Sequence, residues 1–378
     1  MSLLGVPLLV GTVLLTVAVT VVSVWVGGRL RGPALWQGVR RAALVLLCQA
    51  CAVLTVAVVV NGQYEFYATW DDLVGSGSGS GGGGVVLTPL TPPGDGPVRG
   101  AGGAGAGAGV AGGLRSVPFG RDGVRVVRYS GPRTHVEADV YVWLPPQYDQ
   151  PAYRRTLFPV IELLPGYPGS VHNWFTMLDV TGLLMREMAN GQARPAILVA
   201  PTMQLVPGLD TDCTDIPGGP SAETWAAWDV RDMVTANFRA RKDGAGWAAM
   251  GYSEGGFCAV KLAVQHPRRY AAAVSLSGYF TPTAPAVTRS PALLRANDLL
   301  RVLGERRPRV SLLVMGTRQD ADTAQDVMRL RDVVRAPTRV FSSILPTGGH
   351  NYGIWGSMLP AAMKWISQEL DAPPRPRP

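Results

Sequence analysis

The most constraining feature of the sequence is a regular alternation of two patterns that begins at Val124. Short aliphatic and β-branched runs, typical of buried strands, alternate with longer stretches of helical periodicity. We expect strands at 124–129, 135–144, 159–164, 196–200, 247–250, 272–276, 310–315 and 339–345. We expect helices near 175–190, 223–238, 255–266, 291–303, 324–335 and 357–370. Such alternation predicts an α/β fold with a mostly parallel central sheet and helices on both faces.

The composition divides the 378 residues into unlike parts. The first 60 residues are almost purely apolar, glycines concentrate between 75 and 113, and all four histidines lie beyond 114. We therefore expect a membrane anchor over 1–74, a Gly/Ser/Ala-rich flexible linker over 75–113, a catalytic domain over 114–371 and a disordered tail over 372–378.

Two uncharged stretches in the anchor have the length of transmembrane helices. Residues 3–26 would span about 36 Å as a helix, more than the ~30 Å hydrocarbon core of a bilayer. Residues 42–60 form a second such stretch. A signal peptide is the alternative for the first, but a basic n-region and a small-residue cleavage site are not evident. We expect two transmembrane helices.

The flanking charges predict the orientation of these helices. Four arginines lie between them, whereas the segment after the second helix carries Glu65, Asp71 and Asp72 but no Lys or Arg before Arg99. The positive-inside rule then places the short loop in the cytoplasm and the catalytic domain outside. We expect a multi-pass protein of a bacterial cell membrane with an extracytoplasmic catalytic domain.

The net charge of +8 comes mostly from arginine, without a dense basic run that also contains aromatic residues. We therefore expect no nucleic-acid partner. No Cys-x-x-Cys spacing outside the apolar stretches and no histidine-rich spacing suggests a metal, so we expect neither a metal nor a cofactor. Cys48 and Cys51 fall in the second apolar stretch, whereas Cys213 and Cys258 could pair outside the cytoplasm, which the sequence leaves open. The oligomeric state is equally open.

A nucleophile is predicted at Ser253, in the sequence Gly251-Tyr252-Ser253-Glu254-Gly255. The motif follows an expected buried strand and precedes an expected helix, which is the context of a nucleophile elbow. The serine of such an elbow lies on a strained turn, so the residues two before and two after it must be small. The N-terminus of the following helix would also stabilise a developing oxyanion.

The base and the acid are expected later in the chain, in the order serine, acid, histidine. Only His350 follows the nucleophile and its helix, on a glycine-rich loop after the last strand. The acid should follow strand 310–315, where Asp320 and Asp322 both qualify. We favour Asp320, because Asp322 with Thr323 resembles a helix N-cap.

Two backbone N–H groups would form the oxyanion hole. One should belong to Glu254, the residue after the nucleophile. The other should come from the loop after strand 159–164, where Pro165 and Pro168 have no N–H to donate. Gly166, Tyr167 and Gly169 remain, and Tyr167 is favoured.

Several short motifs together resemble the bacterial putative-esterase family of α/β-hydrolases. That family includes esterase D-type enzymes, feruloyl esterases and mycolyltransferases. The motifs are Leu163-Leu164-Pro165-Gly166-Tyr167, Glu223-Thr224-Trp225, Gly251 to Gly256, His266-Pro267 and Gly349-His350-Asn351-Tyr352. The resemblance implies a triad of Ser253, Asp320 and His350 with oxyanion amides at Tyr167 and Glu254. Mycolyltransferases differ in having a glutamate as triad acid and an acidic residue at the position of Pro165.

We therefore expect a membrane-tethered serine carboxylester hydrolase acting through an acyl-enzyme on a small-molecule, lipid or sugar ester. An acyltransferase of the mycolyltransferase type, acting on cell-envelope lipids or sugars, is the first alternative. A non-catalytic tethered binding protein is the second. Trp174, Trp225 and Trp355 are candidate substrate-binding side chains, although the spacing of Trp225 also suits core packing.

Overall fold

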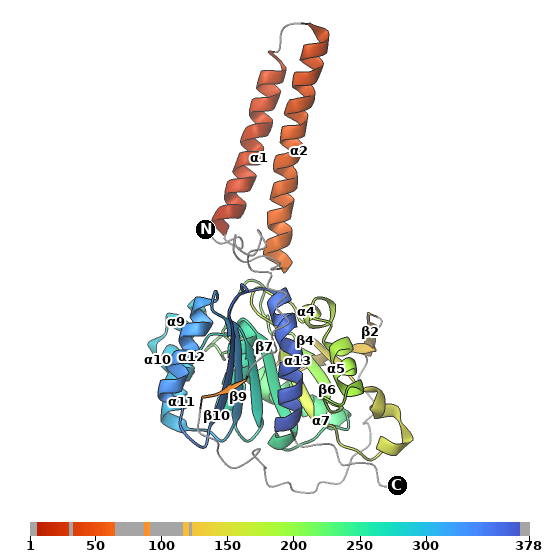
Figure 1. Cartoon of the computed structure of the whole chain (residues 1–378), viewed down its shortest axis with the longest axis vertical. Coiled ribbons are helices and arrows are strands. Elements are labelled where there is room, and N and C mark those ends of the chain that lie inside the picture. The colour runs from red at the N-terminus through yellow and green to blue at the C-terminus, as the bar shows by residue number, and fades with distance from the viewer. Residues whose placement is uncertain (1–5, 30–32, 65–86, 91–115, 121–122, 371–378) are drawn as a thin grey trace. The chain divides into compact units, whose positions relative to one another are not determined.

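The computed structural model describes residues 6–29, 33–64, 87–90, 116–120 and 123–370 (Figure 1). It contains two N-terminal helices and an α/β domain built on a ten-stranded mixed sheet. The chain divides into two compact units, one of which contains the N-terminal helices and residues 348–353. The predicted disordered tail, 372–378, lies outside the described residues.

The sheet has the strand order β1-β10-β9-β8-β7-β5-β6-β4-β3-β2. Its six central strands, from β10 to β6, are parallel, while β1 at one edge and β4, β3 and β2 at the other pair antiparallel. The strands are β1 (Thr88–Pro89), β2 (Ser116–Phe119), β3 (Val124–Ser130), β4 (Glu137–Trp143), β5 (Val160–Leu164), β6 (Ile197–Pro201), β7 (Trp247–Tyr252), β8 (Ala272–Leu276), β9 (Ser311–Thr317) and β10 (Arg339–Leu345).

Helices cover both faces of this sheet, and α13 crosses its front in Figure 1. The α-helices of the domain are α4 (His172–Thr176), α5 (Val180–Ala189), α6 (Ala222–Thr224), α7 (Arg231–Asn237), α8 (Glu254–Gln265), α9 (Pro285–Thr288), α10 (Pro291–Asn297), α11 (Leu299–Arg306), α12 (Ala321–Val333) and α13 (Tyr352–Glu369). A π-helical segment, η3 (Trp225–Val230), joins α6 to α7. Short 3₁₀ turns are η1 (Pro146–Asp149), η2 (Pro151–Tyr153) and η4 (Gly244–Gly246).

The central strands are buried on both sides, as their continuous apolar runs predict. Every residue of β5, β6, β7, β8 and β9 is buried. Alternate strand residues such as Val160 and Leu164 join one large apolar cluster with side chains from α7, α8, α11 and α12. On Tyr252, at the end of β7, the rings of Trp174 from α4 and Trp355 from α13 pack at centroid distances of 5.2 and 4.6 Å.

The predicted architecture is confirmed, with a few local differences. All eight expected strands are present. The helix expected at 291–303 is split because Asp298 is extended and its side chain caps α11, accepting from the Arg301 N–H at 3.3 Å. The linker expected over 75–113 contains β1, whose two residues pair with β10, and the Leu90 N–H donates to the Val340 carbonyl at 2.7 Å. The other linker residues, apart from 87 and 90, lie outside the described part of the chain.

The N-terminal helices are α1 (Val6–Gly27) and α2 (Ala34–Tyr64). Within them, 7–27 and 35–61 are long and apolar enough to span a membrane, with mean hydropathies of 2.4 and 2.7. The two helices pack against each other. Thr16 Oγ1 lies 2.9 Å from Thr55 Oγ1 and donates to the Cys51 carbonyl at 3.1 Å. The two helices are thus candidate transmembrane spans.

Candidate active site

Ser253 occupies a sharp turn between a buried strand and a buried helix. β7 ends at Tyr252 and α8 begins at Glu254, so one residue separates the two elements. Ser253 has φ 55° and ψ −126°, a conformation that costs a non-glycine residue about 1–3 kcal/mol. A hydrogen bond from its N–H to the Leu276 carbonyl of β8, at 2.9 Å, holds this turn. This is the backbone geometry predicted for the nucleophile.

The small neighbours that the motif requires are explained by close backbone contacts. A Cβ on Gly251 would overlap the carbonyl of Gly255, and a Cβ on Gly255 would overlap the carbonyl of Leu164 at the end of β5. Neither position has room for a side chain. The turn therefore forms only with glycine two residues before and two residues after Ser253.

The loop after β5 lies directly against the predicted nucleophile. A Cβ built on Gly166 would be 2.9 Å from Ser253 Cβ, which places this loop beside Ser253. Tyr167 follows on the loop, and Glu254 is the first residue of α8. Within the described residues, neither backbone N–H of Tyr167 or Glu254 has a hydrogen-bond acceptor. Two available donors beside a serine are what an oxyanion hole needs.

Asp320 lies in the loop that follows β9, as expected for the acid. Its N–H donates to Thr317 Oγ1 at 3.1 Å, and its Oδ2 accepts from Thr323 Oγ1 at 3.1 Å. The structure corrects one part of the prediction. The N-cap position of α12 belongs to Asp320, without a side-chain bond to the helix N–H groups, and Asp322 is the second residue inside the helix. The N-cap argument that separated the two aspartates is therefore wrong, and Asp320 as triad acid stays a prediction.

His350 lies in the loop between β10 and α13. A hydrogen bond and a ring contact connect the residues on either side of this loop to the segments that carry Asp320 and Ser253. The Arg318 N–H, two residues before Asp320, donates to the Leu345 carbonyl at the end of β10 at 3.0 Å. Trp355, near the start of α13, stacks on Tyr252, the residue before the nucleophile. The segments that flank this loop are thus tied to the segments that carry Asp320 and Ser253.

A cavity of about 300 Å³ adjoins the loop after β5 that carries Gly166 and Tyr167. Gly166, Tyr167 and Glu254 belong to its lining, so it opens onto the predicted oxyanion hole. The rest of the lining comes from β4, from the loop between β5 and α4, from the start of α4 and from the loop after β6. These residues are Asp139, Tyr141, Pro165, Gly169, Ser170, Val171, His172, Thr202, Met203, Gln204, Leu209, Asp210 and Thr211.

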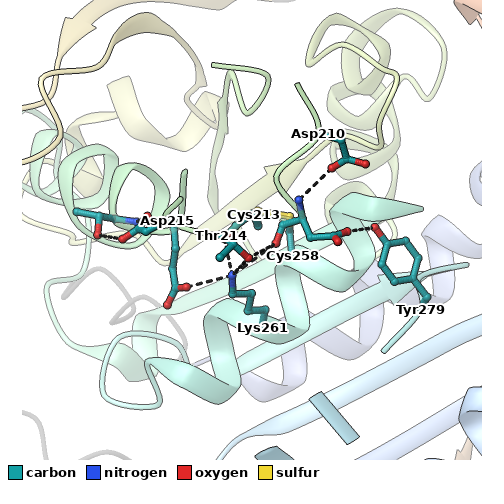
Figure 2. Close-up of a disulfide and its surroundings, with 10 residues drawn as sticks. Asp210, Cys213, Thr214, Asp215, Cys258, Lys261 and Tyr279 are labelled. Carbon is teal, nitrogen blue, oxygen red and sulfur yellow. Dashed lines mark hydrogen bonds and ion pairs between the residues drawn. A yellow bond between two sulfur atoms is a disulfide. The ribbon is translucent and has the colours of Figure 1, made fainter. Parts of the chain in front are cut away.

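The loop after β6, which carries Asp210, is fastened to α8 by a disulfide (Figure 2). Cys213 and Cys258 are bonded, with their Cα atoms 5.5 Å apart, which resolves the pairing that the sequence left open. The buried Lys261 ammonium donates to the Cys213 carbonyl at 2.6 Å and to Thr214 Oγ1 at 2.7 Å. The loop that carries Asp210 and lines the cavity is thus held by α8, the helix that begins directly after Ser253.

A buried ion pair completes this attachment. Glu223 Oε2 lies 3.1 Å from Lys261 Nζ, and its Oε1 lies 2.8 Å from Nε2 of His266. Burial raises the pKa of Glu223, but the Lys261 charge and the hydrogen bonds from His266 and Lys261 outweigh burial and lower this pKa to about 2. Glu223 and His266, part of the motifs that carry the family resemblance, therefore support the loop.

Three carboxyl groups meet at the base of the cavity wall. One oxygen each from Asp210, Asp212 and Glu254 lies within 4.8 Å of the others. The Asp212 carboxylate accepts from the Tyr279 hydroxyl and from the Thr283 and Ala284 N–H groups, the latter two at 2.8 and 2.6 Å. Because these donors already satisfy Asp212, we do not assign a cation to the cluster.

The pKa values of the other two carboxyl groups are both raised. Burial raises the pKa of Glu254 well above its ordinary range, and the charges of Asp210 and Asp212 add to the shift. Burial also raises the pKa of Asp210, while hydrogen bonds from the Asp212 N–H and from Glu254 oppose that rise. The shift is stronger for Glu254, so Asp210 is the more acidic of the two groups. Sequence reasoning missed Asp210, because its position is set by contacts with residues more than 40 positions away.

The predicted substrate-binding tryptophans need correction. Trp174, Trp225 and Trp355 are each 0% exposed, and none lines the cavity. Trp225 Nε1 donates to the Thr202 carbonyl at 3.0 Å, behind the cavity wall. Large apolar rings gain more from full burial than from a place in a polar cleft, so these side chains form the core that supports the site.

Comparisons with known proteins agree with the fold. The model of the family described as Putative esterase matches residues 131–366. An S-formylglutathione hydrolase from Agrobacterium tumefaciens is similar at a TM-score of 0.55 and 15% identity, covering 68% of this chain and 100% of its own. A ferulic acid esterase is similar at a TM-score of 0.53 and 20% identity, over 65% of this chain and 98% of its own. The fluorophosphonate-binding serine hydrolase F of Staphylococcus aureus is similar at a TM-score of 0.52 and 17% identity, over 65% of this chain and 98% of its own.

A curated relative shares part of the sequence. An uncharacterised protein of Corynebacterium glutamicum is 30% identical over 148 residues, which are 38% of this chain and 33% of that protein. The match thus spans one third of the relative's length.

Proposed function

The chain belongs to the Putative esterase family and is a serine carboxylester hydrolase of the α/β-hydrolase fold; we propose that Ser253, Asp320 and His350 form its catalytic triad. We further propose that two transmembrane helices tether the enzyme to a bacterial cell membrane, with the hydrolase domain outside the cytoplasm. The observation that carries the catalytic proposal is the strained Ser253 turn, which the surrounding structure stabilises at the start of α8.

The reaction proceeds in two halves. His350 accepts the proton of Ser253 Oγ as this oxygen attacks the ester carbonyl, and the N–H groups of Tyr167 and Glu254 stabilise the oxyanion. The protonated imidazole, oriented by Asp320, then gives its proton to the leaving alcohol, which departs and leaves an acyl-enzyme. Water attacks the acyl carbon, again with His350 as base, and the carboxylic acid leaves as Ser253 recovers its proton.

Two features support the extracytoplasmic location. Arg29 and Arg31 lie at the connection between the helices, Arg40 and Arg41 lie near the start of α2, and positively charged ends of membrane spans stay in the cytoplasm. The Cys213–Cys258 disulfide suits an oxidising compartment, since cytoplasmic thiols are kept reduced. The disulfide provides an argument for the location that is independent of the charges.

A fluorophosphonate probe tests the nucleophile. The full chain in detergent micelles should be labelled once per chain and should hydrolyse p-nitrophenyl acetate. Ser253→Ala should abolish both, because the probe needs an activated serine. Ser357→Ala, a change of the same kind at an exposed position of α13, should retain both. A folded wild-type protein that resists the probe would refute the catalytic proposal and favour a binding protein.

Cysteine accessibility tests the topology. In a background with Cys48 and Cys51 replaced by serine, single variants Trp36→Cys and Ser130→Cys are treated with a membrane-impermeant maleimide on intact cells. Reaction at residue 130 but not at residue 36 is expected. The opposite pattern would place the hydrolase domain in the cytoplasm.

A further inference from the structure

The cavity beside the nucleophile has an unbalanced charge. Among the described residues that line it are three carboxylic acids, Asp139, Asp210 and Glu254, but neither a lysine nor an arginine. Asp139 has its own counterion, because Arg128 lies 3.2 Å from its Oδ1 in an exposed pair. The charge that the cavity itself presents therefore comes from Asp210 and Glu254.

The Asp210–Glu254 carboxyl pair is held firmly in this wall. Glu254 is the first residue of α8, next to Ser253, so its position depends on the nucleophile turn. Asp210 accepts the Asp212 N–H at 3.0 Å. The segment that follows it is fixed by the disulfide and by Lys261. A fixed acidic wall cannot move away from an unfavourable ligand charge.

We propose that the Asp210–Glu254 carboxyl pair makes this cavity select esters that carry a positive charge in the part that enters it, and reject anionic ones. This inference rests on the proposed function, since it takes the cavity as the substrate-binding part of the Ser253 site. It goes further by identifying two residues that decide the substrate class.

The proposed selection is electrostatic: it favours positively charged groups and disfavours negatively charged ones. The pKa of Glu254 is raised more strongly than that of Asp210, so Asp210 is the more acidic member of the pair. An ammonium group in the cavity is attracted by a carboxylate there and also favours the ionised form of both groups, which strengthens the attraction. A carboxylate or phosphate meets a like charge with neither a lysine nor an arginine beside it among the described residues that line the cavity, where the one histidine is His172. A neutral group experiences neither effect.

Three p-nitrophenyl esters of nearly equal shape separate charge from size. The acyl groups are 4-trimethylammoniobutanoyl, its neutral isostere 5,5-dimethylhexanoyl, and the anionic hemiglutaryl group. For the full chain in detergent micelles, kcat/KM should fall in the order cationic, neutral, anionic. Each step should be about tenfold, as expected for one charge pair in a partly exposed site. A second series with the charge on the alcohol part, built on acetylthiocholine and 3,3-dimethylbutyl thioacetate, covers the other orientation.

Variants assign the preference to the pair. Asp210→Asn should reduce the ratio of cationic to anionic kcat/KM by about tenfold, and Asp210→Glu should restore most of it. Asp332→Asn makes the same change of charge on the exposed surface of α12, outside the cavity lining. It should leave the ratio within twofold of wild type.

Direct binding separates this inference from the proposed function. Calorimetry on Ser253→Ala measures the affinity of the same uncleaved esters without any turnover. Tighter binding of the cationic ester, lost in the Ser253→Ala/Asp210→Asn double variant, supports the charge selection even if wild-type turnover fails. Equal affinity for the three acyl-charged esters, and for the cationic and neutral thioesters of the second series, overturns it, whether or not Ser253 is catalytic.

Discussion

The N-terminal helices and the hydrolase domain place their apolar side chains in opposite ways. In α1 and α2, large apolar residues face outward, among them Leu14, Val24 and Leu46 at 63, 73 and 64% exposure. The hydrolase domain instead buries its large apolar side chains and, with them, Glu162, Asp212 and Lys261 at 0% exposure. The first pattern suits a hydrocarbon solvent, the second suits water.

Both regions contain buried or partly buried polar groups that bond within the protein, such as Lys261 and Thr16, but the energetic consequences differ. A charge buried in the aqueous domain loses strong hydration and depends on its partner. A hydroxyl between two helices in a bilayer gains little, because the separated helices can also satisfy it internally. Polar substitutions should therefore have large effects in the hydrolase domain and small ones in the helix pair.

The largest expected effect is on activity, at the predicted acid. Asp320→Asn should lower kcat by about 10⁴-fold, because an amide cannot orient and stabilise the imidazolium as a carboxylate does. Asp322→Asn, the matched change two residues later, should lower it less than threefold. The measurement is p-nitrophenyl acetate hydrolysis. If the two variants exchange these values, Asp322 is the acid.

Lys261→Met should cause the largest loss of stability. It leaves the largely buried Glu223 without its ammonium partner and removes the donor to the Cys213 carbonyl, so we expect a loss of about 3–5 kcal/mol. The free energy of unfolding in urea, measured on the full chain in micelles, reports this. Lys364→Met, on the exposed side of α13, serves as control and should cost under 1 kcal/mol. A loss below 1 kcal/mol in Lys261→Met would show that the buried pair is dispensable.

Glu162 should make the domain less stable as pH rises. Burial raises the pKa of Glu162 to about 7, although Tyr270, Arg231 and Arg269 oppose this shift. The folded state then binds more protons than the unfolded state between pH 4.5 and 7, so its stability falls across that window by roughly 3 kcal/mol.

Glu162→Gln removes this titration but retains an acceptor for the Tyr270 hydroxyl, which donates to Glu162 Oε2 at 2.7 Å. The difference in unfolding free energy between variant and wild type should therefore grow from pH 4.5 to pH 7. A constant difference across the window would mean that Glu162 titrates at its ordinary pH.

The smallest expected effect concerns the helix pair. Thr55→Val removes the hydroxyl that meets Thr16, which should cost about 0.6 kcal/mol of helix association. Energy transfer between dyes on α1 and α2 during SDS titration measures it. Thr20→Val, which loses only a bond to the Thr16 carbonyl of its own helix, should have no effect on association. A loss above 2 kcal/mol would contradict the contrast drawn between the two regions.

Local patterns were sufficient to predict most of the fold. Aliphatic runs located every central strand, and the Ser253 motif located the turn between β7 and α8 within one residue. Long-range contacts were not accessible in this way. The pairing of Thr88 with Ser342, the disulfide across 45 residues and the Asp210–Glu254 pair depend on segments that meet only after folding. The tryptophans were misassigned because residue type alone does not separate a core ring from a pocket ring.

The close contacts at Gly251, Gly255 and Gly166 constrain how such an enzyme could change over evolutionary time. These positions hold backbone against backbone or against the nucleophile, and no side chain fits. Much of the cavity wall, in contrast, is made of side chains on the loop after β6. New substrates would therefore arise by drift in residues such as Asp210 while the three glycines stay fixed, so that specificity diverges among descendants faster than the reaction itself.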